Sequence, residues 1–219
     1  MTIAVHTPAR RALLALLLTG SSALLGACAL PVNRQPVQQT YRLTAADITS
    51  APLREPVVVQ LLPVRAAAGL QSAAMLYSRS PDQLAPYRDS RWLAPPAQLI
   101  GDAIAQTLAR QPWVSAVQQQ TALANARWAL HCSLDRLEHD LRGSQGTVHL
   151  ALVCELANQR TRQIAAHWRF DRVQPIAVND AAHFARGAQM LLDRALDQIV
   201  RHTRDAVLAA EAESPARDF

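Results

Sequence analysis

The sequence predicts an α/β domain, a three-layer-like α/β sandwich in which a central helix and a long C-terminal helix pack on a mixed, mostly antiparallel sheet. Three segments in the second half of the chain alternate apolar and polar residues, which is typical of strands with one buried face. Two other segments repeat apolar residues at three- and four-residue spacing, which is typical of helices. These patterns together predict both kinds of layer.

The first half of the domain is expected to begin with strands. Residues 57–64, "VVVQLLPV", are β-branched and apolar and lie between two prolines, which favours a buried central strand. Pro63 has no N–H and therefore limits the last rung of that strand. The extended segments expected here are residues 41–43, 57–64, 75–79 and 87–93, with a turn at 80–83.

Two helices complete the prediction. The first begins at Pro95 and Pro96, where a missing N–H is harmless, and ends before Pro112. Asn179 or Asp180 is expected to cap the second helix. The apolar stripe of the first helix consists of Leu99, Ala103, Ile104 (or Gln106) and Leu108, and that of the second of Phe184, Ala188, Leu191, Ala195 and Ile199.

The alternating segments 128–135, 148–156 and 164–171 predict a three-strand antiparallel meander whose even-numbered residues face the core. If the first loop is Arg142 to Ser144, Cys132 lies directly opposite Cys154. Either these cysteines form a disulfide, as an oxidising compartment favours, or they are two free buried thiols. The glycines of "GSQG", Gly143 and Gly146, are expected to supply backbone freedom to the hairpin turn.

The N-terminus has the order of an export signal. Arg10 and Arg11 precede an apolar run, and small residues follow it. The segment ends in Leu25-Gly26-Ala27-Cys28, which resembles a bacterial lipobox and makes Cys28 the expected lipidation site. The expected organisation is a signal peptide over 1–27, a lipidated flexible tether over 28–40, a single periplasmic α/β domain over 41–211 and a disordered tail over 212–219.

Lipidation and composition set the expected surroundings. More than one acyl chain on a residue gives stable membrane anchoring without a spanning helix. Lipoproteins with no Asp after the cysteine usually reach the outer membrane, so the lipid-anchored periplasmic face of a Gram-negative outer membrane is the expected location. All 22 basic residues are Arg, and the formal charge of +5 falls to about +3 without the signal. The arginines are scattered, so no nucleic-acid partner is expected.

The sequence offers no pattern for catalysis. It contains no nucleophile elbow, no lysine-containing phosphate loop, no HExxH and no paired CxxC. His131, His149 and His167 all fall on the predicted polar face, but only His149 and His167 are expected within diagonal reach, which is too few ligands for zinc. We therefore expect no enzyme activity, no catalytic residue, no metal and no cofactor.

The segment "LYSRSPDQLAPYRDSRWLAPP" is similar to the ABC-type transport auxiliary lipoproteins, the PqiC-like group. The order of elements from residue 41 to 208 also resembles that family. The resemblance implies a non-catalytic outer-membrane docking adaptor that works with an MCE-domain protein and an ABC transporter moving lipids or other hydrophobic molecules. The partner-binding candidates that it suggests are Tyr77, Arg79, Tyr87, Arg91 and Trp92, among which Trp92 and the tyrosines are alternatively core residues.

The alternative to an adaptor is a lipid-binding periplasmic carrier, which requires an apolar cavity. The sequence leaves open the cargo, the export route and whether the chain forms a homo-oligomer.

Overall fold

The computed structural model describes residues 37–119 and 126–213. Its elements are β1 (Gln39–Tyr41), β2 (Val57–Leu61), β3 (Arg65–Ala66), the 3-10 helix η1 (Ala68–Leu70), β4 (Ala74–Ser80), β5 (Gln83–Trp92), α2 (Pro96–Ala109), β6 (Val114–Gln118), β7 (Trp128–Asp140), β8 (Thr147–Asn158), β9 (Gln163–Pro175) and α3 (Ala181–Glu213). The predicted signal peptide, Cys28 and most of the predicted tether lie outside the described residues.

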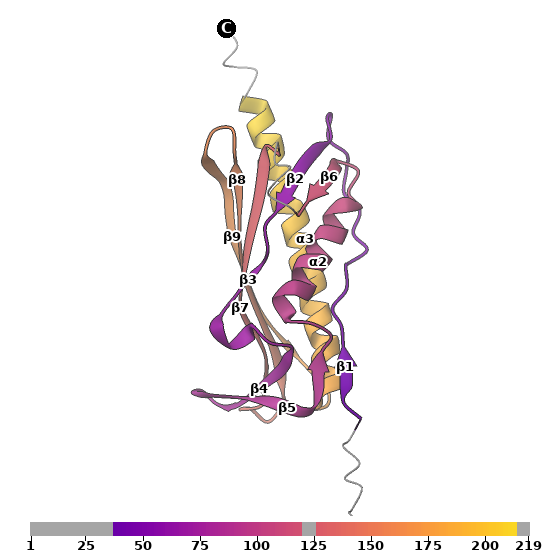
Figure 1. The fold of residues 1–219 in the computed structure, drawn as a ribbon, viewed down its shortest axis with the longest axis vertical. Coiled ribbons are helices and arrows are strands. Elements are labelled where there is room, and N and C mark those ends of the chain that lie inside the picture. The colour runs from indigo at the N-terminus through magenta and orange to yellow at the C-terminus, as the bar shows by residue number, and fades with distance from the viewer. Residues whose placement is uncertain (1–36, 120–125, 214–219) are drawn as a thin grey trace, which may run out of the picture. The chain divides into compact units, whose positions relative to one another are not determined.

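Strand β7 is the centre of a nine-stranded sheet (Figure 1). Along one edge β7 pairs in parallel with β2, then β3, then β4, and along the other edge it pairs antiparallel with β8. Strand β9 continues the meander, β6 lies outside β2, and β5 and β1 lie beyond β4. The long ladders are antiparallel and the short pairings are mostly parallel. The mixed α/β class, the meander and the two helices are therefore confirmed.

The two helices pack against each other and against the sheet. Every residue of both predicted apolar stripes is buried, except the alternative Gln106, which is exposed. Asp180 caps α3, because its Oδ1 accepts the backbone N–H of His183 at 2.7 Å. Helix α3 runs through Glu213, two residues into the predicted tail, and residues 214–219 are not described. No helix in the described ranges is long and apolar enough to cross a membrane.

The predicted central strand 57–64 is two shorter strands. Strand β2 ends at Leu61, and the pairing with β7 resumes at Arg65. Leu61 and Arg65 are four positions apart, whereas their partners Leu130 and Ser133 on β7 are three positions apart, so the chain leaves the ladder by one extra residue around Pro63. The first strand, β1, lies two residues earlier than expected, and β6 was not predicted.

The meander contains two irregularities that the sequence pattern did not reveal. A bulge near Asp135 shifts the β7–β8 register, so that Leu137 pairs with Leu150. The predicted loop Arg142–Ser144 is therefore wrong, since β7 ends at Asp140 and β8 begins at Thr147. A second irregularity, between Leu156 and Ala157, accompanies the exposure of Ile164, which was expected in the core but is 60% exposed.

The hairpin glycines have a different role from the predicted one. No described glycine has a positive φ, so the turn does not use glycine's left-handed conformations. Gly146 is buried instead, and its N–H donates to Asn179 Oδ1 at 3.0 Å. A Cβ atom at this position would overlap Asn179 and lie 2.6 Å from His139 Nε2. Close packing therefore requires glycine at position 146.

Candidate functional site

The β4–β5 hairpin presents a surface that we call the hairpin surface, formed by Tyr77, Arg79 and Tyr87. The rings of Tyr77 and Tyr87 pack edge to face with centroids 5.2 Å apart, and the Arg79 guanidinium lies 5.3 Å from the Tyr77 ring centre. Arg79 is exposed and both tyrosines are half-buried. Three of the five partner-binding candidates are thus together, with an aromatic and cationic character that is common at interfaces.

The other two candidates, Arg91 and Trp92, lie at the far end of β5. Arg91 is exposed, and its Nε donates to the Trp92 carbonyl at 3.3 Å. Trp92 is 1% exposed and packs edge to face on Phe184 of α3, with ring centroids 5.5 Å apart. Trp92 is therefore a core residue, the alternative that the sequence left open.

Below the hairpin surface lies a buried histidine, His139, that the sequence analysis missed. Its Nδ1 is 2.6 Å from the Tyr87 hydroxyl, and its ring stacks on Phe184. If even-numbered residues faced the core along the whole strand, residue 139 would lie on the polar face. The bulge near Asp135 reverses which residues of the last part of β7 face the core. The sequence signal was the run Leu137-Glu138-His139, where the alternation of apolar and polar residues breaks.

Burial controls the protonation of this pair. Burial, with a smaller contribution from nearby Asp180, raises the pKa of Tyr87 to about 12. Burial lowers the pKa of His139, while Asn179, Asp180 and Asp140 oppose that shift. At neutral pH the phenol is therefore protonated and the imidazole is neutral. It follows that the hydrogen bond between the Tyr87 hydroxyl and His139 Nδ1 joins two neutral groups.

We expect His139 to make the fold less stable in mild acid. Because its pKa is lowered in the folded state, the unfolded chain binds the proton more readily as the pH falls below the ordinary value of about 6.5. The free energy of unfolding should therefore decrease from pH 7 to pH 5, by at most about 1.4 kcal/mol per pH unit for one proton. His139→Gln keeps a hydrogen-bonding group but removes this titration. Urea unfolding at several pH values should give it a flatter profile, and equal profiles would contradict the assignment.

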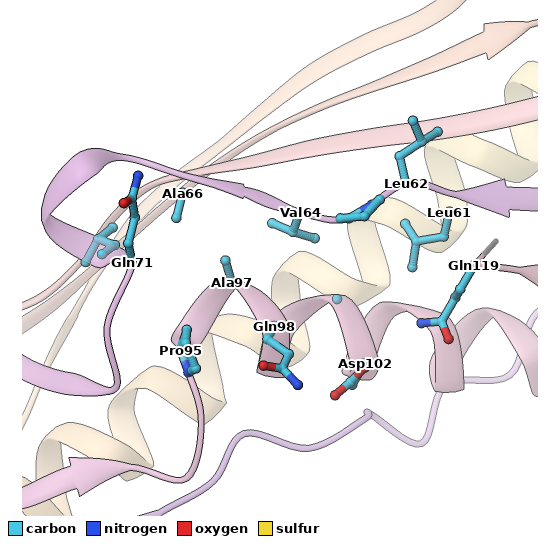
Figure 2. A pocket seen from close by; sticks show the side chains of 13 residues that line it. Leu61, Leu62, Val64, Ala66, Gln71, Pro95, Ala97, Gln98, Asp102 and Gln119 are labelled. Atoms are coloured by element: carbon cyan, nitrogen blue, oxygen red, sulfur yellow. The ribbon is translucent and has the colours of Figure 1, made fainter. Parts of the chain in front are cut away.

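A second candidate site is an apolar groove of about 450 Å³, which we call the α2 groove. Its walls are the first turns of α2 and the connection from β2 to β3, where Pro63 leaves the ladder (Figure 2). Gln71, Gln98, Asp102 and Gln119 are exposed polar residues that form its rim. The apolar residues that line it include Leu61, Leu62, Val64, Ala66, Leu70 and Ala97.

The predicted polar face carries a network of charges. Arg169 joins Asp135 and Asp171 at 3.0 Å each, and Asp171 Oδ1 lies 2.5 Å from His149 Nε2. The hydrogen bond from His149 lowers the pKa of Asp171, and Arg169 adds to that shift. These contacts account for the carboxylates on this face by pairing across strands.

The three histidines of this face are not a cluster. His131 on β7 is opposite Glu155 on β8, as predicted, and His167 on β9 is opposite the same Glu155 from the other side. His149 lies six positions before Glu155 on β8 and is opposite Val173 of β9. The predicted diagonal contact between His149 and His167 is therefore wrong, because the β8–β9 register pairs His167 with Glu155, six positions from His149 on β8. In the described part of the chain, no group of three or more His, Cys, Asp or Glu residues is arranged to hold a metal ion.

A disulfide joins Cys132 and Cys154, whose Cα atoms are 4.2 Å apart. The two residues are directly paired, as the sequence analysis expected, because the bulge lies beyond them on β7. Of the two alternatives left open, the structure therefore contains the bridge. Both cysteines are buried.

Comparison with solved structures supports the fold. A Xanthomonas campestris protein of the family DUF330 is 18% identical, with a TM-score of 0.69 over 80% of this chain and 99% of that one. A hypothetical protein from Chlamydia trachomatis is 12% identical, with a TM-score of 0.50 over 70% of this chain and 99% of that one. At these identities the likeness is one of fold alone. No curated protein matches the chain.

A family model described as ABC-type transport auxiliary lipoprotein component matches residues 41–200. The match begins with β1 and ends within α3, so it includes the hairpin surface and the α2 groove. It also agrees with the family that the segment around β4 and β5 resembles. The chain belongs to the ABC-type transport auxiliary lipoprotein component family.

Proposed function

We propose that the protein is a non-catalytic docking adaptor of an ABC transport system, held by acylated Cys28 on the periplasmic face of the outer membrane. Residues 1–27 serve as its signal peptide and residues 28–40 as a tether. Its partner is an MCE-domain protein, and the system moves lipids or other hydrophobic molecules through the envelope. Family membership supports the transport setting.

The observation that carries the proposal is the hairpin surface. Tyr77 and Arg79 form a cation–π pair on β4, and the ring of Tyr87 packs edge to face on Tyr77. Tyr87 is in turn fixed by its hydrogen bond to buried His139. Aromatic and arginine side chains held in this way lose little conformational entropy on binding, which is typical of residues that dominate an interface. Arg91 adds an exposed positive charge at the far end of β5.

A crosslinking pulldown from membranes tests the proposal. We expect the acylated wild-type protein to recover an MCE-domain protein. The double variant Tyr77→Ala/Arg79→Ala should reduce recovery about tenfold or more, because truncating such anchors often costs about 2 kcal/mol of binding. Arg201→Ala, which removes an exposed arginine on α3, is the matched control and should bind as the wild type does.

Two results would contradict the proposal. Absence of an MCE-domain protein from the wild-type pulldown would reject the partner. Unchanged recovery by the double variant would show that the hairpin surface is not the interface.

A further inference from the structure

We propose that the α2 groove binds a single acyl chain of a lipid. The inference deepens the proposed function, on which it rests for the source of the lipid, by giving this protein direct contact with a hydrophobic cargo. The groove and the hairpin surface share no residue, so the two sites are independent.

The groove follows from local sequence. The Leu62 N–H still donates to the Leu130 carbonyl at 3.0 Å, and the chain then leaves the ladder at Pro63 and Val64 before pairing resumes at Arg65. Gly101 faces this segment from α2, and a Cβ there would lie 3.4 Å from Val64 Cγ2, an ordinary contact distance. Pro63 and Gly101 thus lie on the two elements between which the apolar surface is open.

The lining chemistry selects an aliphatic ligand. Leu61, Leu62, Val64 and Ala97 are aliphatic, and Figure 2 shows Ala97 directed from α2 toward the β2–β3 connection. None of the described lining residues is aromatic, so a flat ring would find no stacking partner among them. A volume of about 450 Å³ falls within the roughly 300–1,000 Å³ of small-molecule sites.

Charge also selects the ligand. Asp102 is the single charged residue among those described around the groove, and its neighbours on the rim are glutamines. A negatively charged group placed here would meet a carboxylate and no described cation. The chain of a lipid therefore fits with its tail along the aliphatic wall and its head outside the rim, where the amides of Gln98 and Gln119 are exposed.

The test uses the full chain in its own membrane. Cells are grown with a long-chain fatty acid that carries a diazirine and an alkyne, irradiated, and the protein is digested after arginine. We expect label in the peptides of residues 55–65 and 92–110, which contain the two walls of the groove. The mass of the adduct distinguishes a free fatty acid from a phospholipid chain.

A matched pair of variants makes the test specific. Gly101→Leu places a side chain into the groove and should reduce labelling of peptide 55–65 about tenfold or more, because the leucine occupies the space that the acyl chain would fill. Leucine favours a helix more than glycine does, so α2 should not be weakened. Gln106→Leu introduces the same residue at an exposed position of α2 and should label as the wild type does.

The outcomes separate this inference from the proposed anchor. Label on the Cys28 peptide reports the anchor alone. Label there without label at 55–65 or 92–110 would overturn the groove while leaving the anchor intact, and the reverse pattern would overturn the anchor alone. Equal groove labelling in Gly101→Leu and wild type would also overturn the inference, as would a crosslink to a protein in place of a lipid.

Discussion

Replacing Trp92 with alanine is expected to lower the free energy of unfolding by about 3–5 kcal/mol, the usual cost of truncating a buried aromatic side chain to alanine. Trp92 is 1% exposed and contacts Phe184 on α3, while its backbone pairs with Tyr41 of β1. The substitution therefore leaves a cavity where β5, β1 and α3 meet. Urea unfolding followed by far-ultraviolet circular dichroism measures the change.

The neighbouring residue provides the control for Trp92. Leu93 is 60% exposed, so Leu93→Ala should change the free energy of unfolding by less than about 0.5 kcal/mol. The comparison also separates the two roles that the sequence left open for Trp92, a partner-binding residue or a core residue. If the Trp92→Ala protein were as stable as the wild type but failed to recover its partner, Trp92 would belong to the docking surface. That result would contradict its assignment to the core.

Gly146→Ala should destabilise the protein by about 2–3 kcal/mol, at the upper end of the cost of overpacking. The new Cβ would overlap Asn179 and press on His139, and both are fixed by their own contacts. Asn179 accepts the Gly146 N–H, and His139 lies between Tyr87 and Phe184. The substitution should therefore also disturb the hydrogen bond and ring stacking between His139 and Tyr87 of the hairpin surface.

Gly69→Ala is the matched substitution for Gly146→Ala. An added Cβ at position 69 has nothing within 4 Å, so this variant should unfold at a urea concentration close to that of the wild type. If the two alanine variants unfolded alike, Asn179 and His139 would have to be free to move, contrary to the packing described here.

The features that could be predicted from the sequence are those that depend on the local spacing of residues. Helix stripes, the Asp180 cap and the pairing of Cys132 with Cys154 all follow from spacing, and the structure confirms them. The sequence did not predict His139, because a bulge depends on both strands of a ladder and reverses every later side chain. The α2 groove was also hidden. Pro63 indicated the end of a strand, but the groove lies between that segment and α2, which only the tertiary structure brings together.

The central place of β7 has a consequence for how the chain acquires its structure. Its partners β2, β3 and β4 come from more than 60 positions earlier, whereas β8 follows directly and is tied to it by the disulfide. Closing the distant pairings costs more chain entropy than closing the hairpin. Formation of the disulfide would thus stabilise the β7–β8 hairpin as a template, on whose free edge the earlier strands can pair.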